Sequence, residues 1–181
     1  PLVDTSWYGT HNSTMTEDYY DGVIVNHIES VPEQLEAGFR VLNFDISITI
    51  TGLVKVCHKL CSEQDPRLTT SAAMLNTWLD SNPDEVVMLF IEDNNINDNI
   101  DNGYMVVAEQ LEEKLVHSDG TSRSYSVQDY AGGLPSTTCT SLPVTKITKR
   151  MVREASRNFI IVTFQSCSSN SEGEHGYRNL V

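Results

Sequence analysis

Two histidines stand where short apolar segments give way to polar residues. His11 lies in the segment Gly9–Ser13 (GTHNS), and His58 closes the segment 53–58 (LVKVCH). Imidazole titrates near neutral pH, so one histidine can act as a general base and the other as a general acid. A lone histidine on a strand is more often structural. The presence of both at the ends of predicted strands is what indicates acid–base catalysis.

Four oxygen-bearing side chains accompany the histidines. Asn43 and Asp45 lie two residues apart, and hence on the same side of one predicted strand. Asn12 follows the first histidine, and Glu92 comes directly after the apolar run 85–91. Amide and carboxylate oxygens suit a hard cation such as calcium or magnesium. A cation beside two histidines stabilises developing charge while protons move, which is the chemistry of phosphate-ester displacement.

The elements that must position these groups alternate between strand and helix. Apolar runs and period-two alternation predict strands, whereas spacing of about 3.6 residues predicts helices. The predicted strands cover residues 40–50, 53–58, 85–91 and 158–164, and the predicted helices cover 31–38, 70–80, 103–115 and 144–155. Ser30 and Glu33 form a capping box ahead of the first helix, and residues 118–142 read as a polar loop. This alternation implies an α/β fold with a parallel sheet, whose site lies at the carboxyl ends of the strands.

Composition narrows the classes of function. A chain of 181 residues with 39% hydrophobic residues predicts one domain, 1–181, with a core at 6–164 and a loosely structured tail at 165–181. The net charge of −13 repels phosphate backbones and argues against nucleic-acid binding. The sequence contains no run of eighteen apolar residues, so it predicts no transmembrane helix. The chain begins with neither Met nor a signal-peptide pattern, so we expect a mature or trimmed chain.

The four cysteines are Cys57, Cys61, Cys139 and Cys167, and they predict at least one disulfide. We favour Cys139–Cys167, which would tie down the long polar loop; free buried thiols are the alternative. A zinc site would need two close pairs, and only Cys57 and Cys61 lie close together. Disulfides indicate an oxidising compartment, so we expect a secreted, extracellular protein. The acidic segment Asp93–Asn102 lacks the glycine of a calcium loop and reads as a solvated loop.

Several segments, taken in order, resemble the catalytic X region of phosphatidylinositol-specific phospholipase C. The segments are GTHNS (9–13), QLEAGFRVLNFD (34–45), VCH (56–58), WL followed by NPDEVV (78–87) and IEDN (91–94). The resemblance extends from residue 6 to residue 94 and, more weakly, to the strand predicted at 158–164. One such motif is moderate evidence, whereas the whole set in the family's order and spacing is strong evidence.

That resemblance implies a TIM-type (β/α) barrel that cleaves a phosphodiester of lipid metabolism at a membrane surface. His11 matches the general base that deprotonates the inositol 2-hydroxyl, and His58 matches the general acid that protonates the diacylglycerol oxygen. The calcium ligands of the family's metal-dependent branch match Asn12, Asn43, Asp45 and Glu92. The metal-free bacterial branch carries a basic side chain on the second strand. Positions 43 and 45 hold none, so the chain resembles the metal-dependent type.

The chain departs from the family pattern in three respects. Asn43 stands where an acidic residue is usual, and Lys59 stands where glycine is usual. A complete barrel needs about 250 residues, and only about four strand–helix units are predicted here. We therefore expect the first half of a barrel, completed by a second polypeptide or by a further C-terminal half.

Two alternatives to a phospholipase C-like phosphodiesterase stay open. One is a catalytically inactive, phospholipase C-like structural or interaction module of a secreted assembly. The other is a relative of phospholipase D or of the glycerophosphodiesterases, which usually show a glutamate–aspartate pair on the second strand. Asn43 breaks that pair.

Overall fold

The computed structural model describes residues 1–17, 25–49, 51–58, 61, 65–95, 103–125, 127–130 and 145–163. In chain order the elements are a short 3-10 helix η1 (Leu2–Asp4), β1 (Gly9–Thr10), α1 (Val31–Glu36), β2 (Val41–Ile48), β3 (Val54–Val56), α2 (Leu68–Ser81), β4 (Val87–Asn95), α3 (Gly103–Lys114), α4 (Val127–Tyr130), α5 (Lys149–Glu154) and β5 (Phe159–Thr163). Lys59, Cys139, Cys167 and the predicted tail 165–181 lie outside the described residues.

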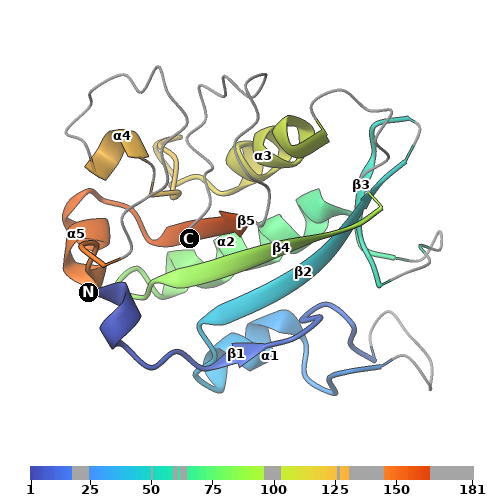
Figure 1. Ribbon diagram of the computed structural model, residues 1–181, viewed down its shortest axis with the longest axis horizontal. Coiled ribbons are helices and arrows are strands. Elements are labelled where there is room, and N and C mark those ends of the chain that lie inside the picture. The colour runs from blue at the N-terminus through green and yellow to red at the C-terminus, as the bar shows by residue number, and fades with distance from the viewer. Residues whose placement is uncertain are drawn as a thin grey trace.

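Four strands form a parallel sheet in the order β1-β2-β4-β5, and β3 pairs antiparallel with the carboxyl half of β2. Successive parallel strands are neighbours in the sheet, and helices connect them (Figure 1). This sequential order is that of a (β/α) barrel, whereas a doubly wound sheet reverses its strand order at one point. The prediction of an α/β fold with a parallel sheet is confirmed.

One face of the sheet packs against α1, α2 and α3. The side chains of β2 alternate, so Leu42, Phe44 and Ile46 all point to this face and are fully buried. Their partners are apolar residues of the neighbouring strands and of the three helices, among them Leu35, Leu75, Leu79, Leu89, Leu111 and Phe159. The helix that opens this layer begins with the predicted capping box, in which hydrogen bonds from Ser30 lower the pKa of Glu33.

The opposite face of the sheet carries a second apolar cluster at the amino ends of the strands. It contains Met88, Ile160 and Val162, together with Val152 of α5 and the half-buried Trp7 of the N-terminal segment. Towards the carboxyl ends of the strands, the same face carries the polar residues of β2. One strand therefore serves the core with one set of side chains and a polar site with the other.

Several element boundaries differ from the sequence prediction by one to five residues, and the short helix α4 lies within the segment 118–142 predicted as loop. β4 continues to Asn95, so Glu92 lies inside the strand rather than after it, because β4 keeps pairing with the long β2 as far as Ser47. β3 ends at Val56, two residues before the predicted end. The predicted helix 144–155 begins only at Lys149, where Thr148 caps it by accepting a hydrogen bond from the Met151 backbone N–H at 3.2 Å.

The free edge of β5 is partly covered at its start. Phe159 N–H donates to the Arg123 carbonyl at 3.0 Å, and its carbonyl accepts from Tyr125 N–H at 2.8 Å. Arg123 is itself fully buried: its Nε donates to Asn76 Oδ1 at 2.6 Å, and its guanidinium pairs with Asp80. This network fastens the chain that follows α3 both to α2 and to the edge of the sheet. It covers the beginning of the apolar strand predicted at 158–164.

Candidate functional site

The backbone of β1 approaches β2 closely at Gly9. A Cβ at this position would lie 3.0 Å from the Cβ of Val41 and 3.2 Å from its carbonyl oxygen. Contacts of 3.0 to 3.4 Å are tighter than nine in ten real Cβ contacts, so a larger residue here would force Val41 to shift by a few tenths of an ångström. The close approach sets the turn after β1, residues 11–13, directly against the middle of β2.

That turn completes the backbone hydrogen bonding of β2 at Asn43. Ser13 N–H donates to the Asn43 carbonyl at 2.9 Å, and Asn43 N–H donates to Ser13 Oγ, also at 2.9 Å. Asn43 Oδ1 in turn accepts from the backbone N–H of Asn12 at 2.9 Å. Asn12 has a φ of 50°, a left-handed conformation that asparagine tolerates better than most residues. Asn43 therefore acts here as an anchor for the turn that carries His11 and Asn12.

Asp45 and His58 form a hydrogen-bonded pair beside this turn. His58 Nδ1 lies 2.7 Å from Asp45 Oδ2, and the Asp45 side chain is 6% exposed, against 32% for His58. Oriented so that both of its amide atoms are satisfied, Asn12 donates from Nδ2 to the two carboxylate oxygens of Asp45, at 3.0 and 3.2 Å. Its Oδ1 accepts from Asn26 Nδ2 at 3.0 Å and lies 3.2 Å from His58 Nδ1.

These contacts fix the tautomer of His58. A carboxylate accepts hydrogen bonds, so the 2.7 Å contact requires the proton on Nδ1. The other ring nitrogen, Nε2, is then the atom that can give or take a proton, as in other carboxylate–histidine pairs. Asp45 orients the ring and balances its charge when both nitrogens are protonated.

Glu92 lies next to Asp45 on the neighbouring strand. The two residues are paired in register between β2 and β4, so their side chains leave the same face of the sheet. Glu92 is half-buried. The prediction placed Glu92 after its strand; it instead lies within β4, on the same face of the sheet as Asp45.

His11 follows β1 and is exposed. Its carbonyl oxygen accepts from His27 Nε2 at 2.7 Å, which ties the chain near residue 27 to the turn. Within the described part of the chain, no hydrogen bond or ion pair to the His11 ring is present. Of the six predicted site residues, hydrogen bonds join Asn12, Asn43, Asp45 and His58. Glu92 is paired in register with Asp45, and His11 directly precedes Asn12 in the chain.

Sequence reasoning missed three residues that support the site. They are Asn26 and His27, which bond to the turn after β1, and Gln34. Gln34 is 1% exposed, and its Nε2 donates to the Ser13 carbonyl at 2.8 Å and to the Glu29 carbonyl at 2.9 Å. A glutamine on the buried side of an amphipathic helix was the available signal for Gln34. Nothing in the local sequence marks Asn26 or His27.

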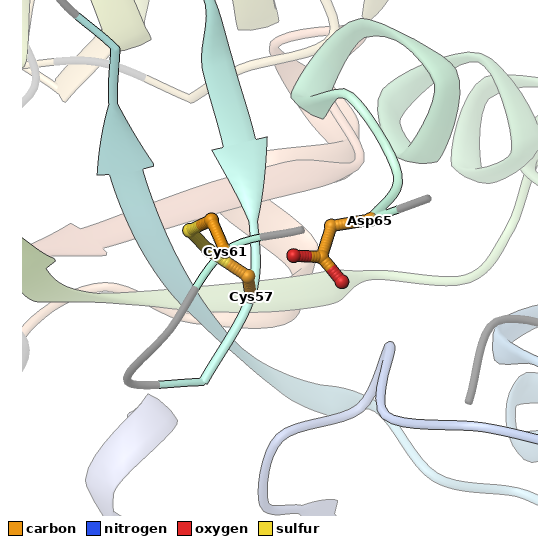
Figure 2. A group of neighbouring side chains, drawn as sticks. All are labelled: Cys57, Cys61 and Asp65. Atoms are coloured by element: carbon orange, nitrogen blue, oxygen red, sulfur yellow. A yellow bond between two sulfur atoms is a disulfide. The ribbon is translucent and has the colours of Figure 1, made fainter. Parts of the chain in front are cut away.

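A disulfide joins Cys57 and Cys61 on either side of His58 (Figure 2). Cys57 is buried, and its N–H donates to the Asp45 carbonyl at 2.9 Å, so the chain entering His58 is held against β2. At least one disulfide was expected, but the favoured pair was Cys139–Cys167. That pair lies outside the described residues and stays a prediction.

The four side chains predicted as oxygen ligands fit a divalent cation only in part. Asp45 and Glu92 are paired in register, so their carboxylates leave the same face of the sheet, and carboxylate oxygens are chemically suited to calcium. The amide oxygens of Asn12 and Asn43 already accept hydrogen bonds from protein donors. Among the described residues, the ligand atoms of Asp45, His58 and Glu92 do not all lie within 4.8 Å of one another. A cation held here would rest mainly on two carboxylates.

Comparison with known proteins gives one family. The family model described as PI-PLC X 1 matches residues 2–124. An uncharacterized protein of Mycobacterium tuberculosis is 30% identical over 145 residues, which are 69% of this chain and 29% of the relative. The PI-PLC X domain-containing protein 1 of Arthroderma benhamiae is 35% identical over 91 residues, which are 49% of this chain and 28% of the relative.

Two bacterial enzymes share the fold. The phosphatidylinositol-specific phospholipase C of Staphylococcus aureus matches with a TM-score of 0.60 at 12% identity, over 90% of this chain and 48% of its own. The enzyme of the same name from Listeria monocytogenes matches with a TM-score of 0.52 at 20% identity, over 90% of this chain and 52% of its own. The chain thus spans about half of these enzymes and less than a third of the curated relatives. Its parallel sheet corresponds to part of a barrel of this kind.

Proposed function

Because the chain belongs to the PI-PLC X family, we propose that it contributes the acid–base site of a phosphoric diester hydrolase of the phospholipase C type. The observation that carries this proposal is the Asp45–His58 pair, which leaves Nε2 of a half-exposed histidine as the proton-transfer atom. Its substrate class is an inositol phospholipid or a related phosphodiester with a neighbouring hydroxyl.

The proposed reaction divides proton transfer between the two histidines. His11 takes the proton of the neighbouring hydroxyl, whose oxygen then forms a bond to phosphorus. The bond from phosphorus to the leaving alkoxide oxygen breaks, and the doubly protonated His58 donates the proton on Nε2 to that oxygen, which leaves a neutral ring with its proton on Nδ1. Asp45 holds the His58 ring in the required tautomer, and Asn12 holds Asp45 through its amide nitrogen.

A divalent cation completes the proposal. Calcium, or magnesium in its place, would be held by Asp45 and Glu92, with Asn12 and Asn43 as the further ligands expected from the sequence. When bound, such a cation stabilises charge on the phosphate oxygens. The hydrogen bonds already made by the two asparagines and by Asp45 support weak rather than tight binding.

Calcium binding is expected to be weak and to depend on the two carboxylates. Calorimetric titration should give a signal for the unmodified chain that is lost in Asp45→Ala and reduced in Glu92→Gln. Asp4→Asn, which removes an exposed carboxylate at the N-terminus, should bind as the unmodified chain does. Equal calcium binding by Asp45→Ala and the unmodified chain would remove the cation from this site.

We propose further that the chain forms one domain, 1–181, which other strands complete into a barrel. Support comes from the sequential sheet, from the match to about half of each bacterial enzyme, and from the edge of β5 beyond Phe159. The complement is either a second polypeptide or a further C-terminal half. The disulfide beside the site favours a secreted protein, because such bonds persist in oxidising compartments. In the described residues, no helix has the length and apolar character needed to cross a bilayer.

The test of the proposed function is hydrolysis of phosphatidylinositol presented in vesicles. We expect release of diacylglycerol and an inositol phosphate, and no release from vesicles of phosphatidylcholine alone, whose headgroup has no hydroxyl beside the phosphate. If neither this chain nor a longer form that includes the remaining strands of the barrel releases any product, the second candidate, a catalytically inactive module, is supported. The observation that favours that candidate is the Asn43 oxygen, which bonds to the Asn12 backbone rather than facing a ligand.

A further inference from the structure

Three potential metal ligands lie close to His58 in the chain, one before it and two after it. The sulfur atoms of Cys57 and Cys61 and a carboxylate oxygen of Asp65 all lie within 4.8 Å of one another. Figure 2 shows the Asp65 carboxylate beside the disulfide. Each ligand follows the previous one by four residues, and such a spacing between the cysteines is common in zinc sites.

Two of the three ligands are held by the sheet. Cys57 follows β3, and its N–H donates to the Asp45 carbonyl. Asp65 precedes Pro66, whose carbonyl accepts from Val56 N–H at 2.9 Å. Both ends of the segment 57–65 are thereby fixed to β2 and β3. The positions of Cys57 and Asp65 are set by backbone hydrogen bonds that do not involve the disulfide.

We propose that, when this disulfide is reduced, Cys57, Cys61 and Asp65 bind one zinc ion. Two thiolates and one carboxylate form a borderline-soft set that suits zinc better than calcium. Three protein ligands leave the fourth tetrahedral position to water. The proposed site is separate from the Asp45–Glu92 carboxylates and does not depend on the phosphodiesterase activity.

Burial supports a cation at this place in the reduced protein. Cys57 is 1% exposed and Asp65 is 4% exposed, whereas Cys61 is exposed and gives access from solvent. When zinc replaces the thiol protons, two thiolates and one carboxylate surround the ion with a net charge of −1. Burial of Cys57 and Asp65 strengthens their attraction to the cation.

Reduction of the disulfide and binding of zinc are two separate steps, and electrons and protons balance in each. A dithiol reductant gives two electrons and two protons to the disulfide, breaks the S–S bond and becomes a disulfide itself. Exposed Cys61 is the sulfur that an incoming thiolate can reach. Zinc then displaces the two thiol protons and forms two Zn–S bonds. Disulfide and zinc site are therefore mutually exclusive states of the same two residues.

The test uses cobalt(II) as a spectroscopic probe for zinc, with millimolar calcium present to saturate carboxylate sites. The full chain is reduced with a phosphine, which brings no thiol of its own, and is titrated with cobalt. We expect a sulfur-to-cobalt charge-transfer band at one equivalent, its loss on adding zinc, and no band in the oxidised chain. A reduced chain without this band would overturn the proposal.

Variants assign the band to its ligands. Cys139→Ser/Cys167→Ser should keep it, and Cys57→Ser/Cys61→Ser should lose it. Asp65→Asn should weaken binding by about tenfold or more, since even residues that merely orient metal ligands contribute about 10- to 100-fold to affinity. Asp4→Asn is the matched control and should bind as the unmodified chain does. A band that survives in Cys57→Ser/Cys61→Ser, or unchanged affinity in Asp65→Asn, would contradict the assignment.

A second measurement avoids any variant that fails to fold. In the unmodified reduced chain, zinc should slow alkylation of Cys57 and Cys61 by iodoacetamide, while Cys139 and Cys167 react at unchanged rates. Peptide mass mapping reads each cysteine separately. Equal protection of all four cysteines, or protection of none, would count against a site at residues 57, 61 and 65.

Discussion

Replacing His58 by alanine is expected to lower the rate of phosphodiester cleavage by about 10²- to 10⁴-fold, the usual contribution of a positioned acid or base. The structure gives the reason: Asp45 holds Nδ1 of His58 at 2.7 Å, and only Nε2 of that ring can then protonate the leaving oxygen. Turnover of phosphatidylinositol vesicles by His58→Ala and by the unmodified chain, in the form that shows activity, measures the effect.

The matched control for this experiment is His117→Ala. His117 lies after α3, and its Nε2 contacts the Ser156 carbonyl at 3.0 Å. We expect it to leave the rate within about twofold, because none of the hydrogen bonds that the structure describes at the proposed site involves His117 and surface substitutions change the stability of the fold by no more than about 0.5 kcal/mol. Circular dichroism shows whether each variant is folded. Full activity in a folded His58→Ala would assign the proton transfer to another residue.

Phe44→Ala should lower the free energy of unfolding by about 3 to 5 kcal/mol, the usual cost of removing a buried phenylalanine ring. Phe44 is 0% exposed and lies on the helix-facing side of β2, between Asn43 and Asp45 in sequence. The cavity left by the ring would therefore lie directly behind the strand that carries the site. Urea unfolding followed by circular dichroism measures the change.

Tyr8→Ala provides the comparison for that experiment. Tyr8 is also aromatic and close to a strand, but it is 73% exposed. Its replacement should change the free energy of unfolding by no more than about 0.5 kcal/mol. Similar losses in both variants would mean that the β2 side chains do not carry the stability assigned to them.

The elements of this fold follow local patterns and could be predicted. The alternation along β2 separated Asn43 and Asp45 from Phe44 correctly, because period two is the property of any strand with one apolar face. The end of β4 could not be found in the same way. Its last residues are polar, and they remain in the strand only because β2 offers hydrogen-bonding partners as far as Ser47.

The orientation of the site depends on contacts between residues distant in the chain. Spacing indicated that Asn12 and Asp45 would come together, but not that the Asn12 amide would turn its nitrogen to Asp45 and its oxygen to Asn26. Hydrogen bonds of this kind depend on tertiary structure and leave no periodic signal. The cysteines gave a similar limit. At least one disulfide was expected, but spacing alone favoured a span across the long loop and did not single out Cys57–Cys61.

The backbone of β2 is paired unevenly along its outer side, with a consequence for amide hydrogen exchange. β1 pairs with it at residues 41–42 and β3 at residues 46–48. Between them, Ser13 N–H and Cys57 N–H supply the hydrogen bonds, and each belongs to the neighbour of a site residue, Asn12 or His58. These two amide protons can exchange with deuterium only when the turn or the hairpin leaves β2. Their protection therefore reports directly how often the site comes apart while the rest of the sheet stays folded.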